Sequence, residues 1–238
     1  MAARDKMPRK RAAKLIVDAA MAVLLLLQMA QQLLPQGFHE LSGIGLGVLF
    51  VVHNLLNLRW YAQLRRGRWT AARVAQTVVN ACCLALLVLM LASGIGMSEL
   101  MTRLGVEFPG VALMRRVHMT CVYASLVVMS FHLGLHGRMV LGLLRGYFGS
   151  LAPSRLASVF GRAAAAAVSA YGVYAFAKLN LWGYLSGGTE FAFMDASVPL
   201  PVFLADYAAV MALAACLGHC LAQLIGERRH KGSKALAR

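Results

Sequence analysis

The sequence predicts an all-α protein, a polytopic bundle of six transmembrane helices. Hydrophobic residues make up 60% of the 238 residues and charged residues only 14%, whereas soluble domains average roughly 45–50% apolar and about 25% charged residues. The apolar residues form stretches of about 20, the length that an α-helix needs to cross a bilayer. Lys and Arg cluster between these stretches, which is typical of loops on one side of a membrane.

The six predicted spans are taken in chain order. The first, LIVDAAMAVLLLL, follows the basic head RDKMPRKR. Because the apolar stretch is long and no small-residue cleavage site follows it, we interpret it as a span rather than a signal peptide. The predicted spans are residues 13–34, 38–60, 73–97, 112–140, 157–180 and 202–226. We expect the first four to form a core domain, 1–145, and the last two to form a C-terminal addition, 146–238.

The distribution of basic residues predicts the orientation. Twenty of the 24 Lys and Arg lie in the N-terminal head, the 59–73 connection, the connection after the fourth span and the C-terminal tail. These segments share one side of a six-span bundle, so the sequence predicts a multi-pass protein of the cell membrane with both termini in the cytoplasm. The net charge of +15 does not indicate nucleic-acid binding, because the charges form no single face.

Four histidines recur at one spacing on two predicted spans. His39 and His53 are fourteen residues apart in the second span, and His118 and His132 are fourteen apart in the fourth. On an α-helix this separation is about 21 Å, and its rotation falls roughly 40° short of whole turns, so each pair shares a helix face. Both spans run in the same direction. We therefore expect His39 level with His118 on the outer side, and His53 level with His132 on the inner side.

This histidine pattern favours haem binding. Two imidazoles from neighbouring helices can hold a haem iron axially, and the cores of helix bundles hold such cofactors. The pattern predicts a four-helix core that binds two b-type haems and transfers electrons across the membrane. No cysteine lies in a C-x-x-C-H motif, so we expect non-covalent binding. Zinc or copper is disfavoured because the members of each pair lie too far apart to share one ion.

Small residues near the histidines fit the same hypothesis. Gly43 and Gly47 lie one and two turns along the helix from His39. Their size would let a porphyrin approach the backbone, although close packing against another helix explains them equally well. Ser125 lies midway between the two histidines of the fourth span, on the same face. We include all three among the expected cofactor-binding residues.

Charged residues and further histidines have alternative interpretations. Arg115 and Arg116 come just before the first histidine of the fourth span, where guanidinium groups could pair with haem propionates or anchor the helix at the interface. His136 lies one turn beyond His132, so either could ligate the inner haem, and the matched spacing favours His132. His136 could instead contact a propionate, a quinone or lipid headgroups. We interpret His219 as a hydrogen-bonded core residue.

The same residues resemble a known family. The stretch FHELSGIGLGVLFVVHNLLNLRWY resembles the DUF4405 domain of flavinylation-associated cytochromes, and LASGIGMSEL followed by RRVHMTCVYASLVVMSFHLGLHGRM resembles the second half of those proteins. The resemblance covers residues 12–145 well and the last two spans loosely. It implies a membrane b-type cytochrome related in plan to ferric-reductase-like bundles. The implied axial ligands are His39, His53, His118 and His132, and the implied partner is an extracytosolic flavoprotein that carries covalent FMN.

Three functions remain open at this level. The leading hypothesis is an electron-transfer cytochrome subunit that links a cytoplasmic-side or quinone donor to an extracytosolic acceptor. We expect a cytochrome subunit or stand-alone module of an oxidoreductase system rather than a complete enzyme. Because we recognise no FMN-attachment or nucleotide-binding domain in the sequence, we expect flavin or NAD(P)H chemistry to come from another polypeptide. The second is a quinone-linked oxidoreductase with its own catalytic site, in which His136 or His219 handles protons. The third is a haem-free transporter or assembly factor with a histidine proton relay.

Overall fold

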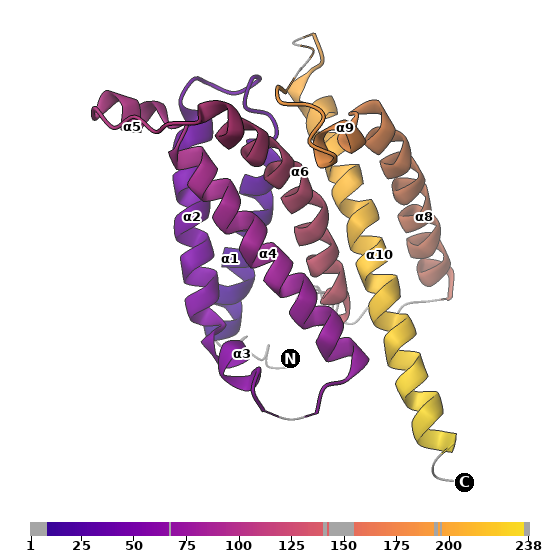
Figure 1. Ribbon diagram of the computed structural model, residues 1–238. Coiled ribbons are helices and arrows are strands. Elements are labelled where there is room, and N and C mark those ends of the chain that lie inside the picture. Colours follow the sequence, from indigo (N-terminus) through magenta and orange to yellow (C-terminus); the bar gives the residue numbers. More distant parts are fainter. Residues whose placement is uncertain are drawn as a thin grey trace, which may run out of the picture. The chain divides into compact units, whose positions relative to one another are not determined.

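The computed structural model describes residues 9–66, 68–139, 142, 155–192, 195 and 197–235, and within these it describes no side chains for residues 9, 155–157 and 227–235. Every regular element in these ranges is an α-helix, so the all-α fold class is confirmed (Figure 1). The helices are α1 (Arg9–Gln28), α2 (Phe38–Leu56), α3 (Leu58–Gln63), α4 (Ala71–Ile95), α5 (Glu99–Arg103), α6 (Val111–Leu135), α8 (Arg155–Lys178), α9 (Leu181–Leu185) and α10 (Leu200–Ala235).

Helical segments of membrane-spanning length and apolarity are abundant. Among the described residues, five segments qualify: Phe38–Leu56, Ala71–Arg103, Val111–Leu135, Ser158–Lys178 and Leu200–Gly226. Large apolar side chains on these segments are exposed, for example Leu41 at 73% and Leu113 at 67%. Extensive exposed apolar surface of this kind marks contact with a membrane or a partner. Helix α1, the first predicted span, is not among the five.

Several of the predicted spans, the first two among them, end earlier than expected. Helix α1 ends at Gln28 because the next backbone N–H groups, such as that of Ala30, donate to carbonyls three residues back and tighten the chain into turns. Pro35 then supplies no N–H donor. Helix α2 ends at Leu56 because Asn57 leaves the helical conformation, with φ −109° and ψ 15°. Its side-chain amide donates to the carbonyl of His53 at 2.8 Å.

The chain divides into two compact units. The first contains Met1–Arg68 and Ala196–Leu200, and the second contains Trp69–Asp195 and Pro201–Arg238. The sequence-predicted domains, 1–145 and 146–238, meet at a boundary that lies outside the described residues, so that division stays a prediction.

The first unit is built on an antiparallel pair of helices, α1 and α2. Near the end of α1, the Gln28 amide donates to the carbonyl of His39 in the first turn of α2 at 3.2 Å. Near the start of α1, the Lys14 ammonium donates to the side-chain oxygen of Asn57, just after α2, at 2.7 Å. Polar side chains thus join the two helices at both ends.

In the second unit, α6 packs along α4 and crosses α10 closely (Figure 1). Two glycines permit the crossing. A Cβ placed on Gly134 of α6 would overlap the backbone carbonyl of Ala215, and one placed on Gly218 of α10 would overlap that of Phe131. Small residues that let helix backbones approach are typical of helix contacts in membranes.

Helices α8 and α10 are joined by a buried ionic group. The Asp206 carboxylate on α10 is only 2% exposed and accepts hydrogen bonds from the Lys178 ammonium, at 2.7 Å, and from the Tyr171 hydroxyl. A carboxylate in an apolar helix requires such partners. A Cβ on Gly172 would overlap the backbone carbonyl of Ala209, so these two helices also approach closely.

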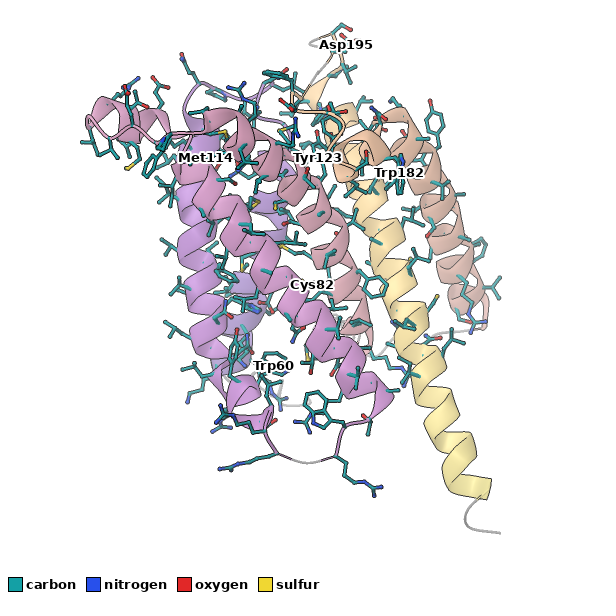
Figure 2. All side chains as sticks on the ribbon, viewed as in Figure 1. Trp60, Cys82, Met114, Tyr123, Trp182 and Asp195 are labelled. Atoms are coloured by element: carbon teal, nitrogen blue, oxygen red, sulfur yellow. The ribbon has the colours of Figure 1, made fainter. Side chains whose placement is uncertain are left out.

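The short helix α9 packs against α6 and α8. Its Tyr184 ring stacks on the Tyr123 ring of α6, with ring centroids 3.9 Å apart and an interplanar angle of 13°. Figure 2 labels Tyr123. The Tyr123 hydroxyl lies 3.5 Å from that of Tyr207 on α10. These three tyrosines therefore join α6, α9 and α10 at one end of the second unit.

Candidate functional site

The predicted ligand histidines lie on two uninterrupted helices. His39 and His53 lie on α2 in the first unit, and His118 and His132 lie on α6 in the second. All four side chains are half-buried. Continuous helix therefore connects the two histidines of each pair. The estimated rise of about 21 Å between them assumed such a helix.

His53 is paired with a carboxylate from α1. Its Nδ1 lies 2.7 Å from Asp18 Oδ1, and the two side chains are 31% and 41% exposed respectively. Because an ionised carboxylate only accepts hydrogen bonds, Nδ1 carries the proton and donates it. In the neutral ring the lone pair is then on Nε2, which is the atom that can bind a metal.

Asn57 connects this pair to a lysine. The Asn57 oxygen accepts a hydrogen bond from Lys14, and its Nδ2 lies 3.5 Å from His53 Nε2, at the outer limit of hydrogen bonding. One turn before Asn57, the side-chain oxygen of Asn54 accepts a hydrogen bond from the Tyr61 hydroxyl. Polar side chains therefore surround His53 at this end of the α1–α2 pair.

At the opposite end of α2, the residues around His39 mainly join α2 to α1. The Gln28 amide that donates to the His39 carbonyl also accepts from the Ser42 hydroxyl at 3.2 Å. A Cβ on Gly43 would lie 3.0 Å from Gln28 Nε2, so the small residue lets α1 approach α2. This contact favours the packing interpretation of Gly43. Gly47, one turn further along, is half-buried.

His118 is held by α4. Its Nδ1 lies 3.0 Å from the carbonyl oxygen of Met90 and 3.2 Å from the Ser93 hydroxyl oxygen. The carbonyl only accepts, and the Ser93 hydroxyl donates to the Leu89 carbonyl at 2.7 Å, so Nδ1–H is the donor to both. A Cβ on Gly94 would lie 3.2 Å from His118 Cε1, so Gly94 leaves room for the ring.

His132 and His136 lie together at the end of α6. Their ring centroids are 4.9 Å apart at an interplanar angle of 64°. His132 belongs to the last turn of the helix, whereas His136 is the residue that ends it, with φ −93° and ψ 6°. A Cβ on Gly137 would lie 2.6 Å from Nδ1 of His219, so this histidine of α10 also contacts the end of α6. Sequence reasoning assigned His219 to the core and did not place it here.

Ser125 is a buried hydroxyl without a hydrogen-bond partner. Its side chain is 0% exposed, and its Oγ contacts no donor or acceptor in the part of the chain that the structure describes. Buried polar atoms of this kind are rare and require an explanation, such as a bound group or a water molecule. Ser125, which the sequence analysis selected as a cofactor-binding residue, is thus also unusual in the structure.

Both predicted propionate-binding arginines have partners within the second unit. Arg116 forms an ion pair with Glu190, and its Nε donates to the Glu190 carboxylate at 2.9 Å. Arg115 lies over the Phe191 ring, with its guanidinium carbon 4.8 Å from the ring centroid. These contacts tie the start of α6 to the segment that follows α9.

Two of the four predicted ligand histidines have hydrogen bonds that suit a metal ligand. Among the described residues, no group of three or more His, Cys, Asp or Glu side chains forms a metal site. A haem iron needs only two protein ligands, since the porphyrin supplies the others. His53 and His118 both donate from Nδ1, the arrangement usual for a metal-bound histidine whose other nitrogen holds the metal.

Comparisons with models of protein families, with curated proteins and with solved structures gave no match to this chain. The resemblance to the DUF4405 domain therefore stays a prediction from the sequence motifs.

Two side-chain contacts of the predicted ligand histidines were missed by sequence reasoning. Asp18 had a usable signal, because an acidic residue inside LIVDAAMAVLLLL is unfavourable in a membrane without a partner. Ser93 had none, since a serine in an apolar helix is common in membranes. Only the packing of α4 against α6 shows that this hydroxyl contacts His118.

Proposed function

We propose that this chain is a membrane b-type cytochrome, of the kind that the DUF4405 resemblance implies, and that it carries electrons across the bilayer. His39 and His118 would ligate the outer of two non-covalent haems, and His53 and His132 the inner one. The observation that carries the proposal is the identical fourteen-residue spacing on α2 and α6. Packing alone gives no reason for two equal spacings on two helices that the sequence predicts to run in the same direction.

The hydrogen bonds of two ligands support the assignment. His53 donates from Nδ1 to a carboxylate and His118 donates from Nδ1 to a carbonyl. These bonds fix the tautomer and limit rotation of each ring, so that each imidazole is prepared to offer Nε2 to a metal. The buried hydroxyl of Ser125, on the helix that carries His118, is a further polar group suited to a bound cofactor.

When bound, each haem would supply a one-electron redox centre. Two histidines would hold each iron, and bis-histidine ligation favours electron transfer over catalysis at the iron. The apolar helices would keep water and ions away from the path. Electrons would pass between a cytoplasmic-side or quinone donor and an extracytosolic acceptor, for which an FMN-bearing flavoprotein is our candidate.

The decisive experiment is the haem content of the purified protein. We expect two b-type haems per chain with low-spin spectra, because two histidines would hold each iron. Acidic solvent should extract all of the haem, since no covalent attachment is expected. A ratio of one haem per chain, or a high-spin spectrum, would contradict the four-ligand scheme. A preparation that contains no haem after growth with ample haem supply would leave the proton-relay and assembly-factor hypotheses.

We further propose that α1 is a sixth span and that both termini are cytoplasmic. Two of the polar side chains of α1 are paired with α2, Asp18 with His53 and Lys14 with Asn57, which lowers the free-energy cost of placing them at a membrane. Reporter fusions after Arg66 and at the C-terminus should give a cytoplasmic signal, and a fusion at Gly187 an external one. An external signal from the C-terminus would mean that an odd number of helices crosses the membrane.

A quinone-linked oxidoreductase is the second candidate. It is favoured by the contact between His132 and His136 and by the position of His219 against the end of α6. Histidines can transfer protons to and from a quinone at neutral pH. Rapid re-oxidation of the reduced protein by a soluble quinone, lost in His136→Ala or His219→Ala, would favour this function over simple electron conduction.

A further inference from the structure

Asp18 of α1 is a carboxylate whose role the proposed electron path does not explain. Its partner is His53, one of the four proposed ligands, at 2.7 Å. The nearest basic residue along α1, Lys14, donates instead to Asn57 on the α2 side. The carboxylate of Asp18 is therefore directed to the imidazole rather than to the lysine one turn away.

We propose that Asp18 is a positioning residue for the inner haem, which holds the His53 ring by its Nδ1–H and strengthens Nε2 as an iron ligand. This inference rests on the proposed function. A carboxylate that accepts a hydrogen bond from a metal-bound imidazole fixes its orientation and raises its basicity. A more basic axial ligand stabilises ferric over ferrous iron, so the contact lowers the reduction potential of the inner haem.

The contact between Asp18 and His53 also makes the two proposed haem sites different from each other. On the outer side, His118 donates from Nδ1 to the neutral carbonyl of Met90 at 3.0 Å. On the inner side the acceptor is the Asp18 carboxylate. Hydrogen bonds to ionised acceptors are roughly twice as strong as those between neutral groups. Both histidine pairs have the same spacing in the sequence, and the structure distinguishes His53 from His118 by the charge of the acceptor.

The test is a redox titration of the Asp18→Asn variant of the full chain. Asparagine keeps the size and one acceptor oxygen but removes the charge. We expect both haems to remain bound and the ferric-to-ferrous ratio of the inner haem at a fixed potential to fall about tenfold, a rise of about 59 mV for a one-electron couple. The low-spin electron paramagnetic resonance signal of the inner haem should shift, and that of the outer haem should not. The inner haem is identified as the component lost in His132→Ala.

Two further variants separate positioning from a structural role. Asp18→Glu retains a carboxylate and should hold the inner potential below that of Asp18→Asn; equal potentials in these two variants would overturn the proposal. If Asp18→Asn does not fold, Asp18→Ser, a small residue that apolar helices tolerate, should show the same rise.

The possible failures are distinguishable. A variant without the charge that binds two haems at wild-type potentials would show that Asp18 only joins α1 to α2, and the cytochrome assignment would stand. Wild-type protein without haem would instead refute the proposed function itself.

Discussion

Replacing His132 with alanine should halve the haem content of the purified protein, while His136→Ala should leave it unchanged. The reason is the position of each histidine along its helix. His132 is fourteen residues from His118, as His53 is from His39, whereas His136 lies about 6 Å further along the helix axis at about 1.5 Å per residue. An iron bound to His53 and His136 would need a tilted ligand axis.

The local structure of α6 supports the same choice. His132 lies within the last turn of the helix, where backbone hydrogen bonds hold it, and His136 is the residue at which the helix ends. The ring of His136 contacts that of His132, with centroids 4.9 Å apart. We therefore expect His136→Ala to change the potential of the inner haem without releasing it, because a neighbour of a ligand tunes rather than holds the metal.

The measurement is the haem-to-chain ratio with a spectrum of each variant, and His39→Ala serves as the matched control that should release the outer haem alone. If His136→Ala halves the ratio and His132→Ala does not, the inner ligand is His136. The equal-spacing argument would then apply only to the outer pair.

The second large effect concerns the crossing of α6 and α10. Gly134→Ala should destabilise the protein by about 3 kcal/mol or more, because the added methyl would overlap the backbone carbonyl of Ala215. An extra methyl group in a well-packed core typically costs roughly 1–3 kcal/mol when neighbouring side chains can move. A backbone carbonyl moves less easily than a side chain, so the cost here should be at the upper end or above it. Thermal unfolding in detergent, followed by helical circular dichroism, measures the change.

Gly161 of α8 provides the matched control. It is exposed, and a Cβ there would have no described atom within 4 Å. Gly161→Ala should be neutral or stabilise the helix by up to about 1 kcal/mol, since glycine in a helix loses more backbone entropy than alanine. Equal melting temperatures for the Gly134→Ala variant and the wild type would show that the two backbones do not approach as closely as described.

Features that depend on local periodicity could be predicted from the amino-acid pattern without a structure. Apolar stretches of about 20 residues predicted the helices, and the structure has long helices at all of these positions within the described residues. The fourteen-residue spacing of the histidines could also be interpreted without a structure, because the rise and rotation per residue of an α-helix are fixed. Helix ends were less predictable, since side chains such as that of Asn57 compete for backbone hydrogen bonds.

The groups that surround the proposed ligands depend on how the helices pack, and the sequence does not reveal them. Asp18 lies 35 positions before His53 in the chain, and Met90 lies 28 before His118. Nothing in the period of one helix specifies what a neighbouring helix brings to its surface, because that depends on how the helices pack. The same holds for Gly134, whose neighbour on α10 makes it a close backbone contact. The ligand spacing is therefore a property of the sequence, and the difference between the two histidine environments is a property of the packing.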